Sequence, residues 1–482
     1  MGRNKPRPLP PSPFPLELSK DLMREMLQRA TEYVVEHIET LPTQPMHATK
    51  GGRKLARALT HSMPETGVPF EKLFRLLFRQ VIPASLNTAS PGYLAYIPGG
   101  GIFHTAIADL IADATNRYIG VWIAGPGIVQ IEENVIQWFA RMLGMPPSAG
   151  GLLLTGGSLA NLVATITARR EKLPPDFLAG TVYTSTEAHH SVLKAALLAG
   201  ILPEHVRSIS TDDRFRMQPE ALRRAIAEDR KTGKTPFLIV ASAGTTNTGA
   251  VDDLEEIANV SQSEQCWLHV DAAYGGFFAL TERGKQVLAG IHRADSVTLD
   301  PHKGLFLPYG TGCLIVRDRE ALRRAHAIPA AYMPPMQDDE RLVDFCELGP
   351  ELSRDFRGLR VWLPFMMHGS NVFRDALDEK LDLARYVADE LRALPGVEII
   401  AEPTLSLLAF RCRFPDLSSD DEDARNRRWM SLVNQKQRVL LTGTTTKGRF
   451  LIRICILSFR THRDRIDMAL ADLRSSLEEL KA

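Results

Sequence analysis

The 482-residue chain lacks long apolar runs, a large excess of one charge and any Cys-x-x-Cys motif. No run approaches the roughly 18–20 apolar residues needed to cross a bilayer. The formal net charge of +1 gives no broad attraction for nucleic acid or an anionic membrane. The five cysteines are odd in number and scattered, which favours reduced thiols in the cytosol. We therefore expect a soluble cytoplasmic protein with neither a nucleic-acid partner nor a membrane partner.

What the chain does have is the composition of a globular protein, with 44% apolar and 24% charged residues. A chain of this length predicts two or three domains. Residues 17–78 carry apolar side chains at helical spacing, and the same spacing returns after Phe356 between short strands. The domain prediction is a helical N-terminal arm at 1–95, a large α/β domain at 96–355 and a small α+β domain at 356–482.

Seven short β-branched runs within the predicted large domain alternate with amphipathic helical segments. Parallel strands need crossover connections, so this alternation predicts a mostly parallel seven-stranded sheet with helices on both faces. The predicted strands are residues 151–155, 181–184, 205–209, 237–240, 267–270, 296–299 and 312–316.

Ligands of an open α/β sheet gather at the carboxyl ends of the strands. The first strand is followed by Gly156, Gly157 and Ser158, which suit a phosphate at a helix N-terminus or form an ordinary turn with a cap. The second is followed by His189 and His190, with no third residue spaced as a metal ligand. His189 is either a ring that stacks on a cofactor or a hydrogen-bonded cap. Residues 243–249 after the fourth strand are small and hydroxylated, suiting either a ligand or a turn.

The two remaining strand ends carry charge. Asp271 ends an apolar strand, where an unpaired carboxylate is costly, so we expect it to face a cation such as a protonated ring nitrogen, or else an Arg or Lys. Lys303 follows the strand at 296–299, where burial is expected to lower the lysine pKa, the condition for an amine that forms Schiff bases. Pyridoxal 5'-phosphate (PLP) chemistry uses all these parts together: Lys303 for the aldehyde, Asp271 for the ring nitrogen, His189 for stacking and the glycine turn for the phosphate.

These residues resemble the PLP-dependent decarboxylase family of aromatic amino acids, glutamate and related substrates. The resemblance rests on His-Val-Asp271-Ala-Ala-Tyr-Gly followed 32 residues later (303 − 271) by Asp-Pro-His-Lys303, and it spans most of the chain. It implies the aminotransferase-like fold, PLP fold type I, and an obligate homodimer whose active sites use both subunits. By this resemblance the cofactor-binding residues are Gly157, Ser158, His189, Thr246, Asp271, Ala273, Ser296, Asp300, His302 and Lys303.

The resemblance also implies residues that act on the substrate. Tyr96 and Pro98 match the family's substrate-pocket segment and mildly favour an aromatic side chain. Tyr332 matches a loop tyrosine thought to protonate the substrate carbon, and with Lys303, His189 and Asp271 it completes the predicted catalytic set. The predicted reaction is decarboxylation of an L-amino acid, most simply an aromatic one, to the amine and CO2.

Other outcomes stay open at this point. The same cofactor could serve an acidic or diamino acid decarboxylase, an aldehyde synthase, or an aminotransferase that binds the substrate carboxylate with Arg453 or Arg460. A catalytically dead scaffold is disfavoured because Lys303, Asp271 and His189 are all retained. A dinucleotide-binding enzyme is disfavoured because the glycines do not complete Gly-x-Gly-x-x-Gly.

Overall fold

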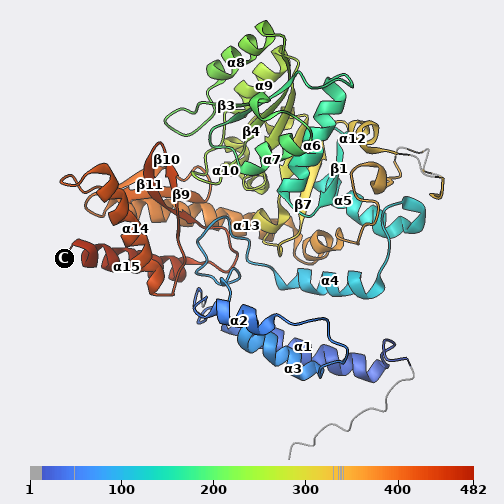
Figure 1. Ribbon diagram of the computed structural model, residues 1–482, viewed down its shortest axis with the longest axis vertical. Helices are drawn as coiled ribbons and strands as arrows, with labels where there is room; N and C mark the ends of the chain where they lie inside the picture. Colours follow the sequence, from blue (N-terminus) through green and yellow to red (C-terminus); the bar gives the residue numbers. More distant parts are fainter. Residues whose placement is uncertain are drawn as a thin grey trace, which may run out of the picture.

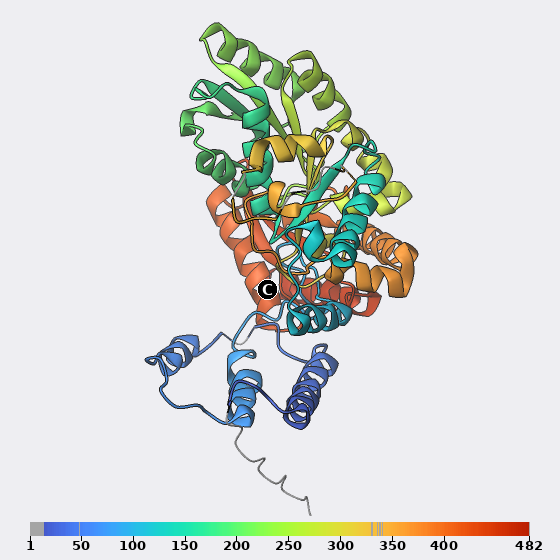
Figure 2. The ribbon, with the colours of Figure 1, turned by 90° about the vertical axis from the view of Figure 1, so that its right-hand side faces the viewer.

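The computed structural model describes residues 14–47, 49–328, 331–334, 336, 339 and 341–481. The chain begins with three helices, α1 (Lys20–Thr40), α2 (Gly52–Leu59) and α3 (Phe70–Leu76), and a π-helical turn, Leu77–Val81. None of them contains a buried residue, and Figures 1 and 2 show that they stand apart from the rest of the molecule. The predicted helical arm is confirmed, while most of its proline-rich start lies outside the described residues.

A seven-stranded sheet forms the centre of the molecule. Its order is β1-β7-β6-β5-β4-β2-β3; β7 runs antiparallel to β1 and β6, and all other neighbours are parallel. The predicted mostly parallel sheet is therefore confirmed. The strands are β1 (Gly150–Leu154), β2 (Gly180–Ser185), β3 (Val206–Ile209), β4 (Thr235–Ser242), β5 (Trp267–Asp271), β6 (Ser296–Leu299) and β7 (Gly312–Val316).

Helices cover both faces of this sheet because its strands bury apolar side chains on both sides. One core lies under α5 (Pro126–Met142), α8 (Pro219–Lys231) and α9 (Leu254–Ser263). The other lies under α6 (Gly157–Lys172), α7 (His190–Leu198) and α12 (Arg319–His326). The remaining helices of this part are α4 (Phe103–Thr115), α10 (Glu282–Val287) and the short α11 (Pro301–Gly304).

The C-terminal part is a four-stranded antiparallel sheet with three helices, α13 (Leu359–Arg392), α14 (Ser419–Gln435) and α15 (Arg463–Lys481). Its order is β10-β11-β9-β8, with β8 (Val397–Ala401), β9 (Leu407–Cys412), β10 (Thr442–Thr446) and β11 (Arg449–Cys455). The predicted small α+β unit is confirmed. The boundaries predicted at 95/96 and 355/356 stay predictions.

The topology brings five loops together. Because β7 is antiparallel to both β1 and β6, β1 points the same way as β2, β4, β5 and β6. The carboxyl ends of these five strands therefore lie at one edge of the sheet, and the loops that follow them meet there. Among the described residues, no helix is both long enough and apolar enough to span a bilayer.

Candidate active site

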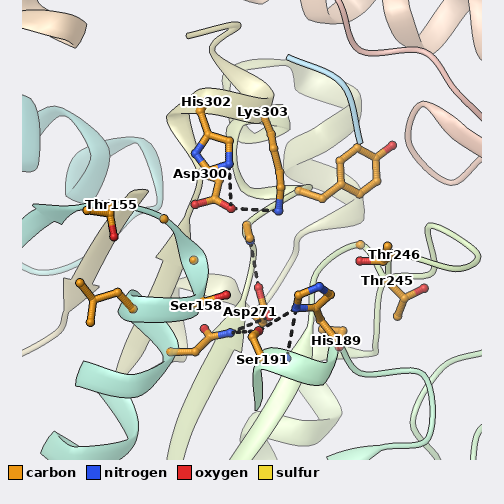
Figure 3. A pocket seen from close by; sticks show the side chains of 18 residues that line it. Thr155, Ser158, His189, Ser191, Thr245, Thr246, Asp271, Asp300, His302 and Lys303 are labelled. Atoms are coloured by element: carbon orange, nitrogen blue, oxygen red, sulfur yellow. Dashed lines mark hydrogen bonds and ion pairs between the residues drawn. The ribbon is translucent and has the colours of Figure 1, made fainter. Parts of the chain in front are cut away.

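A cavity of about 310 Å³ opens at the edge where these five loops meet. Figure 3 shows side chains from the ends of β1, β2, β4, β5 and β6 pointing into it. Lys303 and Asp271, 32 positions apart in the sequence, line the same space. The cavity contains nine of the sequence-predicted site residues: Gly157, Ser158, His189, Thr246, Asp271, Ala273, Asp300, His302 and Lys303.

Lys303 reaches the cavity from α11, the four-residue helix that begins directly after β6. Its Nζ atom lies 2.9 Å from Oδ2 of Asp300, whose side chain is buried. Burial is the largest single influence on the Lys303 pKa and lowers it, but the charge and hydrogen bond of Asp300 together with the charge of Asp271 outweigh burial. The net pKa therefore lies above that of an ordinary lysine, opposite to the lowering expected from burial alone. The second Asp300 oxygen, Oδ1, is buried and has no hydrogen-bond partner among the described residues.

Asp271 ends β5 on the other side of the cavity. Its Oδ2 accepts a hydrogen bond from Nδ2 of Asn161 at 3.0 Å, and its Oδ1 accepts one from the backbone N–H of Ala273 at 3.2 Å. Each carboxylate oxygen can accept about two hydrogen bonds, so both retain capacity for a further donor. The protonated ring nitrogen expected from the sequence would be such a donor.

His189 is the N-cap residue of α7, and this position fixes its ring beside Asp271. Its Nδ1 accepts from the backbone N–H of Ser191 at 3.3 Å and lies 2.7 Å from the Ser191 hydroxyl. Burial lowers the pKa of His189 although the nearby Asp271 charge raises it. The ring is thus held neutral, which suits a side chain that lies against a flat aromatic ligand.

The N-terminus of α6 supplies the phosphate end of the cavity. Its N-cap residue, Gly156, has no side chain to satisfy the free N–H groups of the first turn. Gly157 and Ser158 begin that turn, and Thr246 faces them from the loop after β4. Free N–H groups, a hydroxyl and the positive end of a helix dipole form a suitable phosphate site.

PLP fits this set of residues. An amine, an acceptor-only carboxylate with capacity to spare, a neutral aromatic ring and an uncapped helix N-terminus line one cavity. The described residues contain no group of three His, Cys, Asp or Glu side chains that could hold a metal ion.

Four predicted residues do not line the cavity. Ser296 is fully buried at the start of β6, whereas the cavity lies beyond the end of that strand, and it bonds His269 and Trp267 instead. Ser296 therefore does not line the cavity, and its contact with the cofactor stays a prediction. Tyr96 and Pro98 lie outside the cavity of their own chain, and Tyr96 is 54% exposed with a positive φ of 52°. Tyr332 is 77% exposed on the loop after α12.

The sequence did not identify several residues of the cavity. Thr155 adjoins a predicted position and could have been found as a hydroxyl group at a strand end. Asn161 and Ser191 carry no such signal, because each sits in a helix whose pattern is otherwise ordinary. The cavity residues that the sequence did not single out are Thr155, Leu159, Asn161, Ser191, Ser242 and Tyr274.

The two arginines considered for an aminotransferase are used elsewhere. Arg453 Nε donates to the Asn247 carbonyl at 2.9 Å, and its Nη1 donates to the Thr442 hydroxyl at 3.0 Å. Arg460 donates to the Gly100 carbonyl and lies 4.3 Å from the ring centroid of Phe459. Neither lines the cavity, so neither guanidinium is placed to bind a substrate carboxylate within it.

Comparison with known proteins agrees with this geometry. Residues 53–413 match the sequence profile described as the pyridoxal-dependent decarboxylase conserved domain. The chain is 36% identical over 467 residues to an aromatic-L-amino-acid decarboxylase from Bacillus atrophaeus, covering 96% of this chain and 97% of that protein. It is 28% identical over 458 residues to phenylacetaldehyde synthase from Petunia hybrida, covering 91% and 90%. The crystal structure of Oryza sativa TDC with PLP and tryptamine superposes with a TM-score of 0.92 at 27% identity, covering 96% and 99%.

Proposed function

This chain belongs to the pyridoxal-dependent decarboxylase family, and on that premise we propose that it decarboxylates an aromatic L-amino acid to the primary amine and CO2. It is a PLP-dependent carboxy-lyase. One observation carries the assignment of the site: Lys303, Asp271 and His189 line a single cavity at the carboxyl edge of the sheet.

PLP, when bound, supplies an acceptor for the electron pair released as the bond between Cα and the carboxylate breaks. Lys303 would hold it through the amine, and Asp300 would orient that amine from 2.9 Å away. Asp271 would accept a hydrogen bond from the ring nitrogen and so keep a proton there. His189 would exclude water from one face of the ring. Gly157 and Ser158 would bind the phosphate, with Thr246 and His302 at its rim.

Tyr332 is the proposed donor of the proton that replaces the carboxylate on Cα. Its side chain is exposed and lies outside the cavity of its own chain. We therefore assign this step to a homodimer in which the loop that carries Tyr332 reaches the cavity of the other copy. The same arrangement would bring Tyr96, whose backbone is already in a strained conformation, to the substrate of the other site.

Exposed apolar side chains on three helices support this dimer. The arm exposes apolar residues along its length, and α4 exposes four more at helical spacing. Contiguous exposed apolar surface of this kind marks protein–protein contacts. These side chains are Met23, Leu27 and Val35 on α1, Leu73 on α3, and Phe103, Ile107, Leu110 and Ile111 on α4. The five unpaired cysteines support a location in the reducing cytoplasm.

Subunit mixing tests both the dimer and the role of Tyr332. Lys303→Ala and Tyr332→Phe each inactivate every site of a homodimer. If Tyr332 acts on the other copy's cavity, a mixed dimer contains one site with both residues intact. Random re-association of equal amounts then restores about a quarter of the wild-type activity, since about half the dimers are mixed and each has one good site. No recovery in a mixture shown to contain mixed dimers would overturn the assignment.

A substrate panel tests the reaction. We expect CO2 and amine in equal amounts from at least one of tryptophan, tyrosine, phenylalanine or their hydroxylated forms. The relationship to phenylacetaldehyde synthase makes the aldehyde the second product to measure, together with oxygen consumption. Turnover confined to acidic or diamino acids would overturn the aromatic assignment, and keto acid as the main product would overturn decarboxylation.

A further inference from the structure

Asn161 lies at the centre of a buried hydrogen-bond network under the cavity. It is 2% exposed and sits on the second turn of α6. Its Nδ2 lies 3.0 Å from Asp271 Oδ2 and 3.0 Å from the Ser191 hydroxyl. Its Oδ1 lies 2.7 Å from the Thr298 hydroxyl and 3.0 Å from His269 Nε2. One side chain thus connects α6, α7, β5 and β6 with all four hydrogen-bonding positions filled.

The orientation of this amide is determined by Asp271. A carboxylate only accepts hydrogen bonds, so the atom of Asn161 that faces it must be the NH2 group. Its oxygen therefore faces Thr298 and His269, and both must donate to it. The reversed amide would place two oxygen acceptors 3.0 Å apart in a site without solvent, a costly arrangement.

The same reasoning fixes the proton on His269. Burial lowers the pKa of His269 to about 4, so the ring is neutral near pH 7. Because its Nε2 donates to Asn161, its Nδ1 is bare and accepts from the Ser296 hydroxyl at 2.8 Å. The Ser296 oxygen in turn accepts from Nε1 of Trp267 at 2.8 Å. In this half of the network, Asn161 Oδ1 is the acceptor, and Thr298 and His269 are its two donors.

The other half of the network reaches His189. Nδ2 of Asn161 donates to the Ser191 oxygen, which leaves the Ser191 hydroxyl proton free to point at His189 Nδ1, 2.7 Å away. The backbone N–H of Ser191 also points at that nitrogen. Nδ1 of His189 therefore accepts, and the proton of the neutral ring is on Nε2.

We propose that Asn161 is a positioning residue for the cofactor. Its amide holds the Asp271 carboxylate in place to receive the ring nitrogen, and through Ser191 it holds the His189 ring in one orientation and one tautomer. The inference rests on the proposed roles of Asp271 and His189. Only an amide both donates to Asp271 and accepts from Thr298 and His269. Asp cannot donate to Asp271, and an apolar residue would leave all four polar partners of Asn161 without their bond to it.

Asn161→Asp tests the polarity of the network. The new carboxylate retains the bonds from Thr298 and His269 but places a second negative charge against Asp271. We expect the dissociation constant for PLP, measured by fluorescence titration of the apoprotein, to rise about 10- to 100-fold at pH 8. Repulsion raises the pKa of such a pair, so lower pH protonates one member and restores a donor. The defect should therefore shrink at pH 6 in Asn161→Asp and persist in Asn161→Ala.

Two further variants complete the design. Ser191→Ala removes only the hydroxyl that links Asn161 to His189, and it should raise the dissociation constant for PLP about three- to tenfold. If Asn161→Asp fails to fold, Ser191→Ala still tests whether this link positions His189. Asn426→Asp is the matched control, because Asn426 is equally buried but bonds only backbone groups, those of Cys412 and Glu422 in the small domain. It should leave PLP affinity unchanged, with folding monitored by circular dichroism.

The outcomes separate this inference from the proposed function. If wild-type protein does not gain a visible absorbance with PLP that depends on Lys303, the proposed function fails. If it does, and Asn161→Asp binds PLP as wild type does at pH 8, the positioning role of Asn161 is overturned. If Asn161→Asp loses as much PLP affinity at pH 6 as at pH 8, the proposal is also overturned. Protonation would then bring no relief, which indicates a general structural defect and not repulsion of Asp271.

Discussion

Arg354 and Glu132 form an ion pair in which neither side chain has any exposed surface, with Arg354 Nη2 2.5 Å from Glu132 Oε1. Glu132 lies on α5, and Arg354 lies just before α13. The same Nη2 donates to the Leu153 carbonyl of β1 at 3.1 Å. Burial raises the pKa of Glu132, although the Arg354 and Arg357 charges lower it. The pair therefore connects α5, the segment before α13 and strand β1, whose carboxyl end lies at the cavity.

Breaking this pair should be strongly destabilising. Glu132→Gln removes the fully buried counter-charge of Arg354 and leaves only the partly exposed Glu351, 3.2 Å from Nη1, so we expect a loss of up to about 3–5 kcal/mol in the free energy of unfolding, measured in urea. The double variant Glu132→Leu with Arg354→Met removes both charges and should lose less than the single variant. Arg324→Ala, which removes the exposed partner of Glu171, is the control and should cost about 0–1 kcal/mol. Equal losses for the two pairs would contradict the argument.

The Asp300 carboxylate should slow capture of PLP by the apoenzyme near neutral pH. It raises the pKa of Lys303, and only the unprotonated amine attacks an aldehyde. The rate of PLP attachment in the wild type should rise about tenfold per pH unit below that pKa. Asp300→Asn lowers the pKa, so its profile should move to lower pH with a faster rate at pH 7. Stopped-flow absorbance after mixing apoenzyme with PLP measures both.

Asp295→Asn is the control for this prediction, because Asp295 and Asp300 flank the same strand, β6. Asp295 accepts from the Leu268 backbone N–H and does not line the cavity. Its substitution should leave the rate profile unmoved. A profile that shifts in both variants would point to general disturbance of β6 and refute a specific effect of Asp300 on Lys303.

The reactive residues of the cavity could be predicted because they obey one topological rule. Lys303, Asp271 and His189 each follow a strand, and the carboxyl ends of parallel strands share an edge. The same rule explains why Ser296 does not reach the cavity: it begins β6 and lies one strand length from that edge. Asn161 could not be found, since its role depends on which side chains of β5 and β6 surround one helical position, and spacing along the chain does not contain that information.

The fold could be predicted wherever apolar side chains mark an element. Strand β6 was predicted at its observed bounds, 296–299, because the β-branched Val297 and Thr298 and the apolar Leu299 form a short run typical of a strand. Strand β10 was not predicted, since Thr442–Thr446 contains no large apolar residue and forms the edge of the small sheet by pairing with β11. The helical spacing that returns after Phe356 belongs to α13, which contains Gly369 at φ 75° and so has a break that a periodic pattern cannot show.

His326 should make the protein less stable as the pH falls. Burial, followed by the Arg170 charge, lowers its pKa to about 4. Between pH 6.5 and 4 the unfolded chain binds a proton that the folded protein does not, so stability is lost as the pH falls through this range, by about 3 kcal/mol at its end. His326→Gln can keep a bond to Thr167 but cannot titrate. Urea unfolding at pH 4.5 and 8 should show the wild type losing more stability than the variant; parallel losses would contradict this.

Gly157 leaves little room for an added methyl group. A Cβ there would lie 3.0 Å from Asp300 Oδ2 and 3.3 Å from both Ala273 Cβ and Thr298 Cγ2, so alanine would require these neighbours to move by a few tenths of an ångström. Gly157→Ala should displace the carboxylate that holds Lys303, lower the free energy of unfolding by about 1–3 kcal/mol and weaken PLP binding about tenfold or more. Gly127→Ala in α5 is the matched control, because nothing lies within 4 Å of its Cβ position. Alanine should stabilise that helix by about 0.5–1 kcal/mol without changing PLP affinity. PLP affinity that is the same in both variants would show that the space around Gly157 is not needed for the cofactor.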